Sequence, residues 1–204
     1  QIYDLTYGER CESPSLWVEP DISVDEVKAI RREEIIAAAA VVGAPISCLD
    51  YDDSPLLVGP ERRMQILELI RAFQPDLVLC HWLNDYLHPD HVEAVQAVIW
   101  ASRYCFRPGI KTDHPPCAAP EIVCYEPIAG VSPVAKFSPN LYVDITGVFD
   151  RKVEALRKLA SQPELPERYE IIGKYRALEA QMTANMKQST VAEAFCRLGT
   201  EASP

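Results

Sequence analysis

Two histidines and a carboxylate lie within four residues at His88-Pro89-Asp90-His91, and these side chains are the ones in the sequence best suited to chemistry. Imidazole nitrogen and carboxylate oxygen are ligands of zinc and similar divalent metals. Imidazole also accepts and releases protons near neutral pH. The spacing therefore favours a metal-binding or catalytic role for His88 and His91, with helix capping or packing as the alternative.

The elements on either side would place this segment where α/β proteins bind ligands. Residues 77–82 form an apolar run that reads as a buried strand, and the apolar period of residues 92–104 predicts a helix. In open α/β sheets, ligands bind beyond the carboxyl ends of the strands. Because the segment joins the end of this strand to the start of this helix, we expect it at that edge of the sheet.

Pro89 is favoured in the first helical turn, so Asp90 and His91 are expected in that turn. The positive end of the helix stabilises the Asp90 carboxylate and disfavours protonation of His91, which keeps the imidazole neutral and able to bind a metal. The same field opposes a bare dication, so a site here needs further anionic ligands. Asp85 and His81 are the local candidates, although the position of His81 at a strand end is more typical of a hydrogen-bonded core histidine.

The rest of the chain alternates strand and helix patterns, which predicts an α/β fold with a parallel sheet and right-handed crossovers. A capping box at Ser23 and Glu26 and a glycine at Gly43 bound the first helix. Strands are predicted at residues 2–7, 46–49, 77–82, 122–125 and 141–145. Helices are predicted at residues 24–42, 60–74, 92–104, 148–160 and 167–186.

The composition favours an enzyme-sized domain with a small-molecule partner. A length of 204 residues with 48% hydrophobic content is enough for one domain with a sizeable core. The net charge of -10 argues against nucleic acid or an anionic membrane as a partner, because both need clustered Lys and Arg. Seven cysteines without CxxC spacing predict free thiols in a reducing cytoplasm. The sequence leaves a homo-oligomer open.

Three further segments carry charged side chains. Glu9 and Arg10 follow the first strand, where they form either a solvated ion pair or part of a substrate-facing loop. Residues 107–117 form a proline-rich loop that carries Lys111 and is longer than an ordinary connection, which is typical of a functional or mobile loop. The acidic run of residues 50–53 is expected mostly on the surface.

These residues resemble the PIG-L/LmbE family of zinc-dependent N-deacetylases and their hydratase relatives, over nearly the whole chain. The segments that carry the resemblance are Leu5-Thr6-Tyr7-Gly8-Glu9-Arg10, the helix with Arg31 and Glu34, Asp76 to Trp82, Asp85-Tyr86, His88-Pro89-Asp90-His91, Tyr142-Val143-Asp144-Ile145-Thr146 and Ala192-Glu193-Ala194-Phe195. The resemblance implies a Rossmann-like three-layer α/β sandwich with a mostly parallel sheet, formed by residues 1–204 as a single domain.

The His-Pro-Asp-His segment resembles the second signature of that family. The match implies that His91 is a zinc ligand, that His88 stabilises an oxyanion or assists proton transfer, and that Asp90 orients a histidine. The first signature, a His-Pro-Asp-Asp type segment with the other zinc ligands and the general base, does not occur in the sequence. Because the chain opens at Gln1 inside a strand pattern, we expect it to lack the N-terminal strand and the first metal-binding loop of the family.

Residues 4–13 and 108–115 are most similar to the 4-oxalomesaconate hydratase branch of the family. That branch implies a zinc-dependent lyase that adds water to a small polycarboxylate in aromatic-acid catabolism. In this interpretation Glu9 does acid–base work, while Arg10 and Lys111 bind substrate carboxylates. A zinc-dependent N-deacetylase acting on an N-acetyl sugar or related amide is the alternative. A second alternative is a truncated, non-catalytic remnant.

Overall fold

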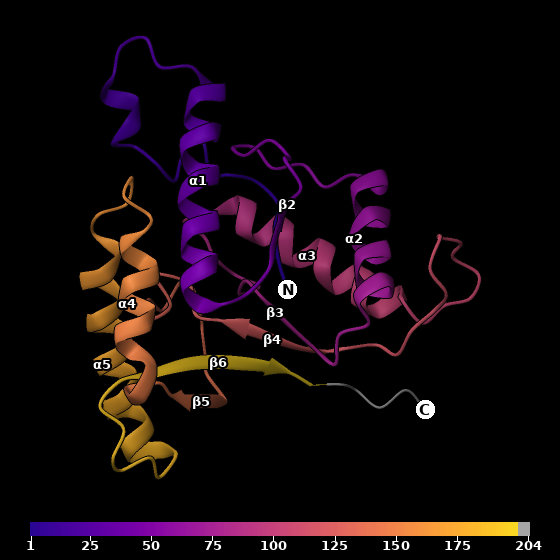
Figure 1. Cartoon of the computed structure of the whole chain (residues 1–204). Helices are drawn as coiled ribbons and strands as arrows, with labels where there is room; N and C mark the ends of the chain where they lie inside the picture. The colour runs from indigo at the N-terminus through magenta and orange to yellow at the C-terminus, as the bar shows by residue number, and fades with distance from the viewer. Residues whose placement is uncertain (200–204) are drawn as a thin grey trace. The chain divides into compact units, whose positions relative to one another are not determined.

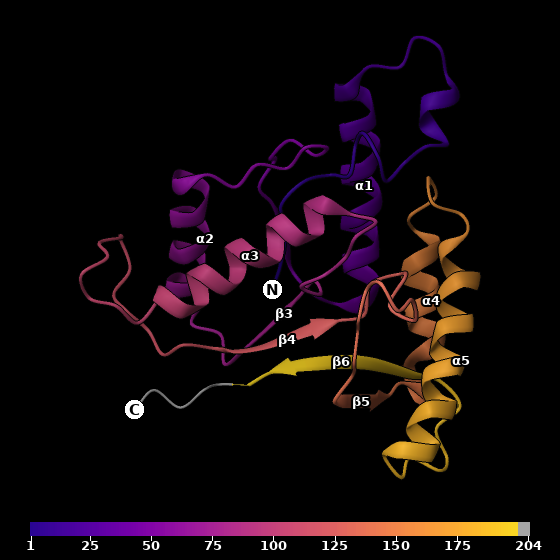
Figure 2. The ribbon, with the colours of Figure 1, turned by 180° about the vertical axis from the view of Figure 1, so that it is seen from behind.

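The computed structural model describes residues 1–199 and shows a mixed α/β chain, which confirms the predicted fold class (Figures 1 and 2). The strands are β1 (Ile2–Asp4), β2 (Ile46–Cys48), β3 (Leu77–Cys80), β4 (Glu121–Tyr125), β5 (Leu141–Asp144) and β6 (Ala192–Leu198). The helices are α1 (Val24–Val42), α2 (Pro60–Phe73), α3 (Pro89–Tyr104), α4 (Phe149–Arg157) and α5 (Leu165–Thr183), with short 3-10 turns η1 (Leu16–Val18) and η2 (Thr146–Val148).

The chain divides into two compact units, each built from two separate stretches of sequence. Unit 1 contains residues 1–56 and 142–193, and unit 2 contains residues 57–141 and the chain from Ala194 onward. The segment around His88 belongs to unit 2, whereas Glu9 and Arg10 belong to unit 1. The single-domain organisation stays a prediction.

In unit 1, α1 connects the parallel strands β1 and β2, whose register pairs Ile2 with Ile46. The helix begins where the sequence predicts: the Ser23 hydroxyl accepts from the backbone of Glu26, and the Glu26 carboxylate accepts from Ser23 in return. It ends at Gly43, whose φ of 76° is the left-handed conformation that glycine adopts at little cost. α1 packs against α4.

In unit 2, β3 and β4 are parallel and pair Cys80 with Cys124, while β4 and β6 are antiparallel and pair Cys124 with Cys196. The strand order in this unit is β3-β4-β6. Val95 of α3 packs with Cys80, Ile122 and Cys124 in a buried apolar cluster, so α3 is anchored on this sheet. None of the helices in residues 1–199 is long and apolar enough to cross a membrane.

Candidate functional site

The predicted chemical segment lies at the junction of β3 and α3, as expected. β3 ends at Cys80, so His81 is the next residue along the chain. α3 begins at Pro89, which puts Asp90 and His91 in its first turn, and His88 is the N-cap residue. The His88 side chain makes no capping hydrogen bond, which removes the capping explanation for this histidine. Its backbone N–H donates to the Asp85 carbonyl over 3.2 Å, and this turn brings Asp85 to the start of the helix.

One buried carboxylate holds both histidines of the segment. Asp85 is 2% exposed, and its Oδ2 lies 2.8 Å from His91 Nδ1 and 3.2 Å from His88 Nδ1. An ionised carboxylate only accepts hydrogen bonds, so each ring that bonds to an ionised Asp85 donates from Nδ1. In His91, Nε2 is then the ring nitrogen that lies away from Asp85, where it could bind a metal or accept a proton. A carboxylate that fixes the orientation of a metal-binding histidine in this way is a common arrangement.

The donor set of this cluster fits a divalent metal. Asp85, His88 and His91 each offer a ligand atom, and these atoms lie within 4.8 Å of one another. Two imidazole nitrogens and a carboxylate oxygen are typical zinc donors. Asp85 is therefore either a ligand itself or the group that orients the two histidines.

Stacked imidazole rings form a short column beside this carboxylate. The His91 ring stacks on His81 with centroids 3.9 Å apart and on His88 with centroids 4.7 Å apart, and His81 also contacts the edge of Tyr125. Burial, with a smaller contribution from His91, lowers the pKa of His81 to about 3. His81 is thus a neutral ring packed against His91, and it restricts the orientations that His91 can adopt.

The two other unit 2 residues singled out from the sequence lie in different settings. Asp90 is partly buried in the first turn of α3. The carboxylate that contacts both histidines is Asp85, so the orienting role assigned to Asp90 stays a prediction. Lys111 lies in the loop that follows α3, where its exposed amino group donates to the Pro108 carbonyl over 3.0 Å. Both views show this loop beyond the C-terminal end of α3 (Figures 1 and 2). His88 and His91 lie at the opposite, N-terminal end of that helix.

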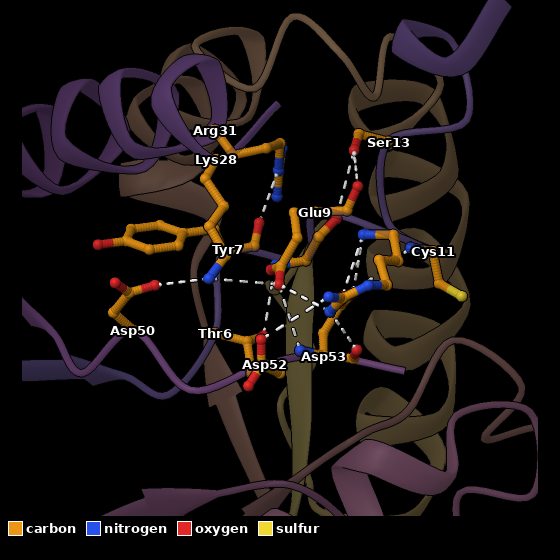
Figure 3. A network of polar contacts seen from close by, with 12 residues as sticks. Thr6, Tyr7, Glu9, Cys11, Ser13, Lys28, Arg31, Asp50, Asp52 and Asp53 are labelled. Carbon is orange, nitrogen blue, oxygen red and sulfur yellow. Dashed lines mark hydrogen bonds and ion pairs between the residues drawn. The ribbon is translucent and has the colours of Figure 1, made fainter. Parts of the chain in front are cut away.

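In unit 1, the loop after β1 buries Glu9 completely (Figure 3). The turn depends on Gly8, which has a φ of +66° and whose Cβ, if it had one, would lie 2.7 Å from Glu12 Cβ. Glu9 Oε1 accepts from Arg10 Nη1 at 3.2 Å and from the Asp53 amide at 3.3 Å, and Lys28 Nζ lies 3.8 Å away. Glu9 Oε2 has no hydrogen-bond partner among residues 1–199. The sequence left a solvated ion pair open for Glu9, and its burial excludes that.

Arg10 is held beside Glu9 and stays partly open to solvent. Its side chain is 37% exposed, and Nη1 donates to the Asp53 carbonyl over 2.8 Å. The backbone N–H of Arg10 lies 3.1 Å from both carboxylate oxygens of Asp53. The surface prediction for the acidic run was right for Asp50 and Asp52 but wrong for Asp53, which is 3% exposed.

The chain is similar to known proteins over most of its length. Residues 2–102 match the PIG-L family, described as GlcNAc-PI de-N-acetylase. The chain is 32% identical over 180 residues to 4-oxalmesaconate hydratase of Pseudomonas putida, covering 86% of this chain and 67% of that protein. It is 29% identical over 153 residues to diacetylchitobiose deacetylase of Thermococcus kodakarensis, covering 70% of this chain and 53% of that protein.

A solved structure extends the likeness to the fold. The crystal structure of GalB, the 4-carboxy-2-hydroxymuconate hydratase of Pseudomonas putida KT2440, superposes with a TM-score of 0.90 at 28% identity. The superposition covers 99% of this chain and 85% of the GalB chain. The chain is 32% identical to the hydratase over 86% of its length, residues 2–102 match the PIG-L family, and the His88 to His91 segment lies at the start of α3. The chain therefore belongs to the PIG-L family.

Proposed function

We propose that the protein is a zinc-dependent hydratase that adds water across the C=C bond of a small polycarboxylate of the 4-oxalomesaconate type. The observation that carries the proposal is the 32% identity to a 4-oxalmesaconate hydratase over 86% of the chain. The TM-score of 0.90 to the crystal structure of the hydratase GalB supports the same choice. A place in aromatic-acid catabolism and a reducing, cytoplasmic location are part of the proposal. The location is supported by free cysteines, of which Cys80, Cys105 and Cys124 are buried.

Zinc is proposed to bind at His91 through Nε2, because Asp85 occupies Nδ1. An imidazole nitrogen is a typical zinc donor, and the contact with Asp85 orients the His91 ring for that role. When bound, zinc supplies a Lewis acid that polarises an oxygen of the substrate or of water. His88, which shares Asp85 with His91, is proposed to assist proton transfer through its own Nε2, and Asp90 is proposed to help orient the histidines.

Hydration of an alkene places a hydroxyl on one carbon and a proton on its neighbour, so the enzyme needs a group that takes a proton and one that gives it back. Glu9 is proposed for this acid–base work, and its partnerless Oε2 supports the choice because that oxygen is not committed to another donor among residues 1–199. Arg10 is proposed to bind a substrate carboxylate, supported by the 37% exposure of its side chain. The role of Lys111 as a second cation for the anionic substrate stays a prediction, because its loop follows the end of α3 opposite to the histidines.

The second candidate is hydrolysis of an N-acetyl group on an amino sugar or related amide. It is favoured by the 29% identity to diacetylchitobiose deacetylase and by the de-N-acetylase description of the family. The two reactions differ in the electrophile, which is an activated alkene in the first and an amide carbonyl in the second. A hydratase needs cations for substrate carboxylates, and the neighbouring Arg10 and Lys28 beside Glu9 favour it over the deacetylase.

One assay separates the two reactions. The zinc-loaded, full-length protein is incubated with an enoate polycarboxylate of the 4-oxalomesaconate type and, separately, with N,N′-diacetylchitobiose. We expect the enoate absorbance to fall and no acetate to appear. The matched control is Glu9→Gln, which keeps the size of the side chain and should slow hydration. Acetate release without hydration would overturn the proposal in favour of the deacetylase.

A further inference from the structure

Asp53 makes contact with the loop of Glu9 and Arg10 through every polar group that it has (Figure 3). Its carboxylate accepts from the backbone N–H of Arg10 at 3.1 Å on both oxygens and from that of Cys11 at 3.4 Å. Its carbonyl accepts from Arg10 Nη1 at 2.8 Å, and its amide donates to Glu9 Oε1 at 3.3 Å. One residue therefore binds the main chain of the loop and both of its functional side chains.

These contacts fix the two side chains relative to each other. Arg10 Nη1 lies between Glu9 Oε1 at 3.2 Å and the Asp53 carbonyl, so a rotation of either side chain breaks a bond to Asp53 or to its partner. Glu9 is fully buried and Asp53 is 3% exposed, which makes these hydrogen bonds costly to exchange for water. Without the carboxylate, the amides of Arg10 and Cys11 would lose their acceptor, and the loop would lose the constraint that aligns it.

Charge in the cluster supports the same conclusion. Arg10 Nη1 lies 3.5 Å from Asp53 Oδ1, and Lys28 Nζ lies 3.8 Å from Glu9 Oε1, so two cations face two buried carboxylates. Removing the Asp53 carboxylate takes one of its negative partners from the Arg10 guanidinium, which lies beside Glu9. The guanidinium is then free to move toward solvent, where Asp52 lies 3.7 Å from Nη2.

We propose that Asp53 is a positioning residue, which holds the carboxylate of Glu9 and the guanidinium of Arg10 in one fixed arrangement for the reaction. The inference deepens the proposed hydratase function and rests on it for its catalytic consequence. Asp53 itself does not touch the substrate in this proposal. Its effect passes through the two side chains that it holds.

The first test measures the loop itself, by hydrogen exchange of the Arg10 and Cys11 amides in the full-length protein. In Asp53→Ala both amides lose their acceptor, and we expect their exchange to be faster by about tenfold or more. Asp53→Asn keeps one carbonyl acceptor and should restore part of the protection. The matched control Asp52→Asn removes the same charge one residue earlier, at an exposed side chain, and should leave both amides unchanged. Unchanged exchange in Asp53→Ala would overturn the inference whatever the activity.

The second test measures hydration by the same variants. A displacement of about 1 Å in catalytic groups costs on the order of 100-fold, so kcat/KM of Asp53→Ala should fall by that order. Displacement of Glu9 should lower kcat, and displacement of Arg10 should raise KM. A variant that only folds poorly has fewer active molecules, so its apparent kcat falls while its KM is unchanged. Asp53→Asn should recover part of the loss, and Asp52→Asn should stay within about threefold of the parent. An unchanged KM with a lower kcat, or no recovery in Asp53→Asn, would refute positioning.

If the parent protein does not hydrate the enoate while exchange still rises in Asp53→Ala, the proposed function fails and the structural role of Asp53 stands.

Discussion

Asp85 Oδ2 lies 2.8 Å from His91 Nδ1, and this contact decides which nitrogen of His91 faces away from the carboxylate. The same carboxylate reaches His88, so one buried group contacts Nδ1 of both rings. The stack of His81 on His91 holds the ring from another side. The metal-binding geometry of the segment therefore depends on Asp85 as much as on the histidines.

Replacing Asp85 should weaken zinc binding. Asp85→Asn offers one carbonyl acceptor in place of two carboxylate oxygens and no charge, so we expect the zinc affinity of the full-length protein to fall by about 10- to 100-fold. Competition with a fluorescent chelator measures this affinity. The matched variant is Asp90→Asn, which changes the carboxylate inside the His-Pro-Asp-His segment. An equal fall in Asp90→Asn would show that Asp90 shares the orienting role.

Replacing His91 and replacing His88 should have different effects on zinc binding and on turnover. His91→Ala removes the proposed ligand and should abolish zinc retention after dialysis of the full-length protein. His88→Ala should leave the metal in place and reduce turnover by about 100-fold or more, as expected for loss of a proton-transfer group. Metal content by atomic absorption and initial rates measured on the same samples test both statements. Equal metal loss in the two variants would contradict this division of roles.

Features that are local in sequence were predictable. The bounds of α1 follow from the capping box at Ser23 and from Gly43, and the start of α3 follows from Pro89. The proximity of His88 and His91 follows directly from their positions at the N-cap and in the first turn of that helix. In each case a few neighbouring residues contain the physical reason for the structure.

Features that depend on distant residues were not predictable in the same way. Asp53 lies in an acidic run that reads as surface, and only folding brings it to Arg10, which is 43 residues earlier in the chain. β6 begins with the weak strand formers Ala192-Glu193-Ala194 and was missed. Its residues 195–198 pair with β4, a partner that is distant in the sequence. A run of aspartates after a short strand was the available signal for Asp53, but it does not say which aspartate turns inward.

Asp4 should make the stability of the fold depend on pH. Burial raises the pKa of Asp4 from 3.8 to about 6, against a smaller opposing effect of Arg31. The folded state then binds more protons than the unfolded state between these two values, so stability falls as pH rises from about 4 through about 6. Asp4→Asn removes this loss and should be more stable than the parent by about 3 kcal/mol above pH 6, with little difference near pH 4.

Urea unfolding of Asp4→Asn and the parent at several pH values measures this effect. Glu26→Gln is a control of opposite sign, because hydrogen bonds from Ser23 lower the pKa of Glu26. The stability contributed by that carboxylate is present above its unfolded pKa and is lost as pH falls. A gain in Asp4→Asn that does not change between pH 4 and pH 7 would contradict the assigned titration.

The buried pair of Arg31 and Glu34 should be a cooperative unit in unit 1. Arg31 Nη1 lies 2.8 Å from Glu34 Oε2, and its Nε donates to the Tyr7 carbonyl at 2.9 Å. Ser161 donates to Glu34 through both its amide and its hydroxyl, each at 2.7 Å. Arg31→Met leaves the Glu34 charge buried without its ion-pair partner, so we expect a loss of about 3 to 5 kcal/mol in the free energy of unfolding.

A double-mutant cycle tests this cooperativity. Arg31→Met/Glu34→Met removes both charges together, so the double variant should be more stable than the sum of the two single losses predicts, by about 1 to 3 kcal/mol. The exposed pair of Arg168 and Glu164, one turn apart on a solvated surface at 4.0 Å, is the matched control. Its cycle should give a coupling below about 0.5 kcal/mol. Additive losses for Arg31 and Glu34 would mean that each acts through its other hydrogen bonds, with Tyr7 and Ser161, and not through the ion pair.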